Sequence, residues 1–88
     1  MEIEYSPMFL RMLKTLSQAL QEEAMEKIDL FQNPDTHRLL KVHKLQGRLA
    51  GKYSFSVNYS TRIIFQFTKI RSPRAASLLA IGDHAIYR

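Results

Sequence analysis

One apolar run, Thr61–Phe67, constrains the fold of this 88-residue chain more than any other segment. At period two, Ile63 falls on one face with the two phenylalanines, and Arg62 falls on the other face with Gln66. A strand this apolar and this rich in β-forming residues is typical of the centre of a sheet. The guanidinium of Arg62 should therefore be held by the scaffold.

Two helices are predicted before this strand. Glu2–Tyr5 alternates polar and apolar residues, which predicts a short first strand, and Ser6 with Pro7 then forms a helix-start signal. Ser17 is a second candidate N-cap, and Asn33-Pro34 should end the second helix because the residue before proline avoids helical geometry. Apolar residues at helical spacing predict one inward face: Phe9, Met12, Leu13, Leu16, Leu20, Ala24, Ile28 and Phe31.

The second half of the chain is predicted to be a β-meander. Tyr53–Val57 alternates between aromatic and small polar residues, Asn58–Ser60 has turn chemistry, and Ser77–Ile81 is a last apolar strand. The predicted order is β-α-α-β-β-β, with two N-terminal helices packed on one face of an antiparallel sheet. We expect an α+β fold in which residues 1–88 form one domain.

Charge is divided unevenly along the chain. Residues 1–37 hold three Lys/Arg and seven Asp/Glu, whereas residues 38–88 hold ten Lys/Arg and the single acid Asp83. The second half must therefore present a positive field, for which phosphate is the commonest target. A solvated basic surface, or a patch that receives an acidic protein, would give the same charge pattern.

Several classes of site and location are disfavoured by the sequence. The chain has no cysteine, so disulfides and thiolate metal sites are excluded. His37 and His43 lie six residues apart without a carboxylate cluster, which does not match a metal motif, and no cofactor is expected. The apolar runs are too short to span a membrane and the N-terminus lacks a signal-peptide pattern, which predicts a cytoplasmic protein.

Cations and proton carriers without a metal suit the cleavage of RNA through its own 2′-hydroxyl. That step needs a base, an acid and a cation that stabilises charge on phosphorus. Imidazole can take either proton role, and the planar fork of Arg62 can grip two phosphate oxygens. Alternatives stay open: His84 could cap the strand end beside Asp83, Tyr87 could pack in the core, and Arg62 could pair with Asp83 or a helix acid.

Four segments in order resemble the RelE/ParE superfamily of bacterial toxin–antitoxin toxins, particularly its RelE/YafQ-like branch. These segments are His43–Gly47, Tyr53–Tyr59, Arg62–Phe65, and Ile81–His84 followed by Tyr87. The resemblance covers nearly the whole chain. It implies a small toxin that enters the ribosomal A site, cleaves mRNA without a metal, and is neutralised by an antitoxin that wraps around it.

The resemblance also implies residue roles. His43 is implied as the general base, Arg62 as the phosphate clamp, His84 as the general acid or charge stabiliser, and Tyr87 as the orienting aromatic group. The basic residues expected to contact mRNA or ribosomal RNA are Lys41, Lys44, Arg48, Lys52, Lys69, Arg71 and Arg74.

The sequence departs from the family pattern at several serines. Ser56 and Ser60 stand where YafQ-like members carry a further histidine and an aspartate, and Ser54 and Ser56 stand where RelE has strand lysines. The site would then have fewer proton-transfer groups than either prototype. The competing hypothesis is therefore a non-catalytic protein, either a ParE-like gyrase inhibitor or an inactive RelE homologue that still binds its antitoxin.

Overall fold

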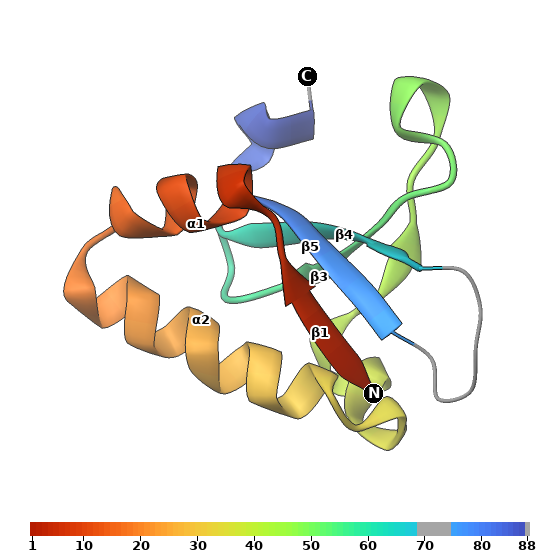
Figure 1. Cartoon of the computed structure of the whole chain (residues 1–88), viewed down its shortest axis with the longest axis horizontal. Helices are drawn as coiled ribbons and strands as arrows, with labels where there is room; N and C mark the ends of the chain where they lie inside the picture. Colours follow the sequence, from red (N-terminus) through yellow and green to blue (C-terminus); the bar gives the residue numbers. More distant parts are fainter. Residues whose placement is uncertain (69–74, 88) are drawn as a thin grey trace.

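The computed structural model describes residues 1–68 and 75–87, the latter without the side chain of His84. Figure 1 shows two N-terminal helices followed by a twisted sheet. The elements in chain order are β1 (Glu2–Tyr5), α1 (Pro7–Lys14), α2 (Gln18–Phe31), η1 (Pro34–Leu40), β2 (His43–Lys44), η2 (Gly47–Leu49), β3 (Tyr53–Ser56), β4 (Arg62–Phe67), β5 (Ala75–Gly82) and η3 (His84–Tyr87), where η marks a 3₁₀ helix.

Both predicted helix starts are confirmed by side-chain caps. Ser6 Oγ accepts a hydrogen bond from the Phe9 amide at 3.0 Å, and Ser17 Oγ accepts one from the Leu20 amide at 3.2 Å. Each cap satisfies one of the amides that a helix N-terminus leaves without an internal partner. The break between α1 and α2 is thus set by Ser17, as the sequence predicts.

The sheet has the order β1-β5-β4-β3-β2, which places β4 in the centre as predicted. The α+β class with its helices first is confirmed, and two details differ from the predicted meander. β1 pairs parallel with β5. The two strands are far apart in the chain, so no hairpin turn forces them to be antiparallel. His43–Lys44, which the sequence did not predict as a strand, pairs with β3 as the short edge strand β2.

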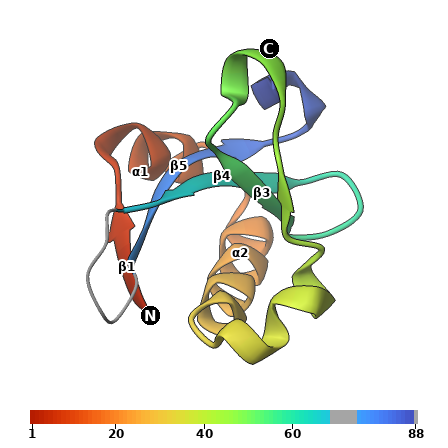
Figure 2. The same ribbon diagram turned by 90° about the vertical axis from the view of Figure 1, so that its right-hand side faces the viewer.

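The strand register gives β4 two different faces. Ile63 lies opposite Phe55 on β3 and Ile81 on β5, on the face towards the helices. Arg62 lies opposite Ser56 and Gly82, on the other face. Figure 2 shows α2 beneath the sheet and the C-terminal η3 above it. We call the side of the sheet away from α2 the outer face.

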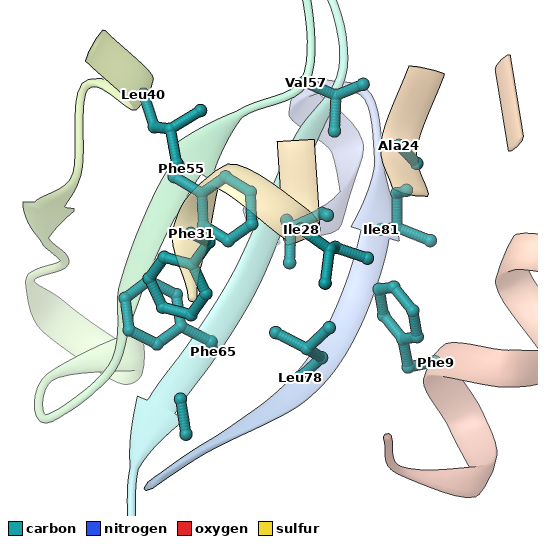
Figure 3. Close-up of a cluster of buried hydrophobic side chains, with 12 residues drawn as sticks. Phe9, Ala24, Ile28, Phe31, Leu40, Phe55, Val57, Phe65, Leu78 and Ile81 are labelled. Carbon is teal, nitrogen blue, oxygen red and sulfur yellow. The ribbon is translucent and has the colours of Figure 1, made fainter. Parts of the chain in front are cut away.

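Aromatic rings form the centre of the core (Figure 3). The ring of Phe31, at the end of α2, lies 4.6 Å from that of Phe55 and 4.5 Å from that of Phe65, measured between centroids. The ring of His37 stacks on its other side at 4.7 Å, and His37 Nε2 is hydrogen-bonded to the Phe31 carbonyl oxygen at 2.8 Å. His37 is therefore a structural residue that closes α2.

Replacing Phe31 with alanine should strongly destabilise the fold. Truncating a fully buried phenylalanine costs about 3–5 kcal/mol, a large part of the 5–15 kcal/mol that stabilises an ordinary domain. Urea denaturation followed by circular dichroism measures the loss. Leu30→Ala, next to it on α2 but 40% exposed, is the control and should cost less than about 1 kcal/mol. Equal losses for the two variants would contradict this account of the core.

Tyr5 should make the fold sensitive to alkali. Burial raises the pKa of the Tyr5 phenol above its usual 10.0, and the nearby Asp29 carboxylate adds to the shift. Since the folded state favours the neutral phenol, this contribution is complete below pH 10.0 and is lost as pH rises through the folded pKa. The free energy of unfolding of Tyr5→Phe should therefore fall less steeply above pH 10.0 than that of the wild type. Tyr59→Phe, with an exposed ring, is the control, and identical slopes for Tyr5→Phe and wild type would refute the prediction.

Candidate functional site

The turn between β3 and β4 is organised by Asn58. Its Oδ1 accepts hydrogen bonds from the amides of Ser60 at 3.0 Å and Thr61 at 2.9 Å, and its Nδ2 donates to Glu23 Oε1 on α2 at 2.9 Å. An asparagine that bonds the backbone two or three residues ahead fixes a tight turn. The turn is therefore rigid, and it is tied to the helix layer.

This turn holds the guanidinium of Arg62. One terminal nitrogen, Nη1, donates to the carbonyl oxygens of Asn58 at 2.8 Å, Tyr59 at 3.1 Å and Thr61 at 3.3 Å. Within residues 1–68 and 75–87, Arg62 makes no ion pair with Asp83 or with an acid of the helices. Carbonyl oxygens leave the positive charge unneutralised, so Nε and Nη2 keep donors for an anion.

A second group of site residues meets around Ser54, on the outer face. Ser54 is fully buried, and its Oγ lies 3.3 Å from Nε2 of His43 on β2. The hydroxyl of Tyr87 in η3 donates to the same Oγ at 3.1 Å. Ser54 therefore links side chains of β2 and η3, two elements that are distant in sequence. The structure thus brings two of the predicted catalytic residues together through a serine.

The hydrogen bonds in this group have a defined direction. His43 Nδ1 lies 3.0 Å from the carbonyl oxygen of Lys41, and a carbonyl can only accept. In neutral His43 the proton therefore sits on Nδ1, and Nε2 is the acceptor. Ser54 then donates to Nε2 and accepts from Tyr87, giving one chain from the Tyr87 hydroxyl to the Lys41 carbonyl.

Arg62 and the Ser54 group are neighbours on one face. Ser54 lies opposite Ile64, and Ser56 lies opposite Arg62, one step of two residues further along the same strands. Two residues of a β-strand span about 7 Å. Ile64, the partner of Ser54, follows Arg62 on the same face of β4, and it is only 3% exposed although it lies outside the main core cluster.

Only some of the other predicted site residues are described by the structure. The backbone of His84 starts η3, two residues after Gly82, the β5 partner of Arg62, and its side chain lies outside the description. Lys41, Lys44 and Arg48 are exposed and Lys52 is half-buried, whereas Lys69, Arg71 and Arg74 lie outside the described residues.

Two features of the site were not predicted from the sequence: the burial of Ser54 and the role of Asn58. Ser54 was expected on a small polar outer face, yet it is buried, because β2 and η3 both close over it. Asn58 was expected only as a turn residue, yet its carbonyl and side chain position Arg62. The available signal was the run Asn58–Thr61 directly before the arginine, since turn residues fix the start of the strand that follows.

No metal site or membrane span is found in the described part of the chain. Its histidine, aspartate and glutamate side chains do not form groups of three or more that could hold a metal ion. None of its helices is long and apolar enough to cross a bilayer.

Solved structures with the same architecture include toxins of bacterial toxin–antitoxin systems. YafQ from E. coli BL21(DE3) is 19% identical with a TM-score of 0.77, over 98% of this chain and 96% of that chain. The toxin–antitoxin complex RelBE2 of Mycobacterium tuberculosis is 16% identical with a TM-score of 0.74, over 94% of this chain and 96% of that chain. A YoeB/ParE toxin from Agrobacterium tumefaciens is 15% identical with a TM-score of 0.72, over 96% of this chain and 99% of that chain.

The chain has the fold of the RelE/ParE superfamily of toxins. The resemblance inferred from the sequence is confirmed at this level. No family model matches the chain, and no curated protein sequence matches it. In this RelE/ParE fold the Ser54 group and Arg62 share the outer face of the sheet.

The direction of the hydrogen-bond chain can be tested directly. Nitrogen-15 NMR of the imidazole of neutral His43 should show the Nδ1-protonated tautomer, because the Lys41 carbonyl accepts from Nδ1. Ser54→Ala removes the donor to Nε2 and should leave that tautomer in place. A predominantly Nε2-protonated ring in the wild type would contradict the assignment.

Proposed function

We propose that this chain is the toxin of a toxin–antitoxin module and that it cleaves mRNA on the ribosome without a metal. The RelE/ParE fold supports the toxin assignment, because the similar structures are toxins of such modules. One observation supports the cleavage assignment most: the hydrogen-bonded group of His43, Ser54 and Tyr87 lies one register step from Arg62. Among the described residues, Arg62 has no ion-pair partner.

The proposed reaction uses the 2′-hydroxyl of the RNA as nucleophile. His43 takes the 2′-hydroxyl proton on Nε2, where the entering hydroxyl replaces the 3.3 Å contact with Ser54. The 2′-oxygen forms a bond to phosphorus as the bond to the 5′-oxygen breaks, and His84 protonates that oxygen. Arg62 stabilises the charge on the phosphoryl oxygens, and Tyr87 orients the phosphate. The products are a 2′,3′-cyclic phosphate and a 5′-hydroxyl.

The exposed cations extend this site towards the ribosome. Lys41, Lys44 and Arg48 are exposed, and their charges would attract ribosomal RNA and the message. We infer that a protein with this activity acts in the cytoplasm, where ribosomes are. RelBE2 of M. tuberculosis and DinJ–YafQ of E. coli are toxin–antitoxin complexes, and we infer a cognate antitoxin for this chain as well.

A second candidate function is non-catalytic. Both ring nitrogens of His43 are already hydrogen-bonded, one to Lys41 and one to the buried Ser54, which favours a structural histidine. The protein would then bind its antitoxin without cutting RNA, or would inhibit gyrase as a ParE-like toxin does.

Purified protein added to translating ribosomes distinguishes the two functions. The wild type should produce cleaved mRNA, read by primer extension. Arg62→Lys keeps the charge but loses the fork, and we expect roughly a 100-fold slower reaction, the usual cost of one transition-state donor. His84→Ala should slow cleavage by a similar factor, since a general acid contributes about 100-fold or more.

The matched control is Arg11→Ala, which removes an exposed arginine of α1 and should leave the rate unchanged. Circular dichroism checks that each variant is folded. Intact mRNA together with inhibited supercoiling by gyrase would refute the cleavage proposal and favour the ParE-like function.

A further inference from the structure

A cationic depression lies between the end of η1 and the β3–β4 turn. It has a volume of about 290 Å³, and three cations from separate segments line it: Lys27 of α2, Lys41 and Arg62. Ser56 and Tyr59 also contribute to its wall, and none of the described residues that line it is acidic. This concentration of positive charge is not explained by the packing of the fold.

The charge of Lys27 is not neutralised by its helix neighbour. Glu23, four residues earlier on α2, is the partner that helical spacing favours. In the structure Glu23 Oε1 instead accepts a hydrogen bond from Asn58 Nδ2 at 2.9 Å. Among the described residues, Lys27 has no ion-pair partner. The α2 helix, acidic elsewhere, thus presents a lysine to the depression.

Lys41 adopts a backbone conformation that a lysine does not favour. Its φ of 57° and ψ of 46° lie in the left-handed region, where it is the one non-glycine residue in the described part of the chain. Glycine or asparagine would place the carbonyl that binds His43 equally well and with less strain. The turn alone therefore does not account for a lysine at this position, and Lys41 is one of the residues that line the depression.

Tyr59 gives the depression an aromatic rim. It is 96% exposed at the tip of the β3–β4 turn, and Asn58 fixes the turn that carries it. An exposed aromatic ring on a fixed turn beside cations is the arrangement that stacks the bases of single-stranded nucleic acid.

We propose that the cationic depression binds a phosphate of single-stranded RNA while the adjoining base stacks on Tyr59. Lys27 and Lys41 would hold this phosphate, and Arg62, which the depression shares with the outer face, would lie between it and the reacting phosphate. An RNA strand seated there continues over Ser56 towards His43, so the depression grips the nucleotide beside the one that reacts. The inference rests on the proposed function for the identity of the strand.

Binding of a short fluorescent 2′-O-methyl RNA, which cannot be cut through its 2′-position, tests the proposal by anisotropy. Lys27→Ala and Lys41→Gly should each weaken binding roughly fivefold and lower the salt slope by about 0.7, the value for one phosphate contact on a single strand. Tyr59→Ala should weaken binding with little change in that slope.

Two controls separate lost contacts from lost structure. Lys14→Ala removes an exposed lysine of α1 and should bind RNA as the wild type does. Lys41→Gly should melt at the same temperature as the wild type or higher, because glycine tolerates positive φ. Weaker RNA binding in a variant at least as stable as the wild type supports a contact made by the Lys41 side chain.

Equal RNA affinity of wild type, Lys27→Ala and Lys41→Gly would overturn the inference. Polyglutamate that binds the wild type, loses affinity in both variants and is not displaced by the RNA would also overturn it, because the depression would then receive an acidic peptide. The proposed function can fail separately. If RNA binding depends on Lys27 and Lys41 but the protein does not cleave mRNA on ribosomes, the inference of an RNA-binding depression holds and the proposed cleavage activity is refuted.

Discussion

The central strand β4 has to serve two environments at once, and the rest of the structure depends on this constraint. Its core face carries Ile63 and Phe65, both fully buried. Phe65 packs against the ring of Phe31 from α2 (Figure 3). Its outer face begins with Arg62, whose charge would be costly in that core. Period-two alternation separates the two, and the antiparallel partners on both sides fix the register. The site is therefore positioned by the same contacts that stabilise the fold.

Positioning on the outer face is achieved with neutral groups. Three carbonyl oxygens hold Arg62, a carbonyl orients His43, and a buried hydroxyl joins His43 to Tyr87. Carboxylate partners would hold the cations as well but would cancel their charge. With neutral partners the face stays rigid and positive, which is what the binding of a phosphate requires.

Sequence patterns predicted the elements that depend on local chemistry. Ser6 and Ser17 cap helices because their hydroxyls reach amides three residues ahead, and the alternation of β4 reports its two faces directly. The parallel pairing of β1 with β5 was not predictable in this way, since it joins segments more than 70 residues apart. Ser54 was predicted on the outer face, but its burial was not, because its partners His43 and Tyr87 come from distant segments. The roles of His43, Arg62, His84 and Tyr87 remain predictions.

The chemistry of the RNA ends tests the central claim most directly. Cleavage by the 2′-hydroxyl, assisted by His43 and Arg62, leaves a 2′,3′-cyclic phosphate or the 3′-phosphate formed from it, and a 5′-hydroxyl on the downstream fragment. Mass spectrometry of mRNA fragments recovered from ribosomes treated with the protein should find these termini, and Arg62→Lys should reduce their yield. Fragments that end in a 3′-hydroxyl, or a message that stays intact, would contradict the account.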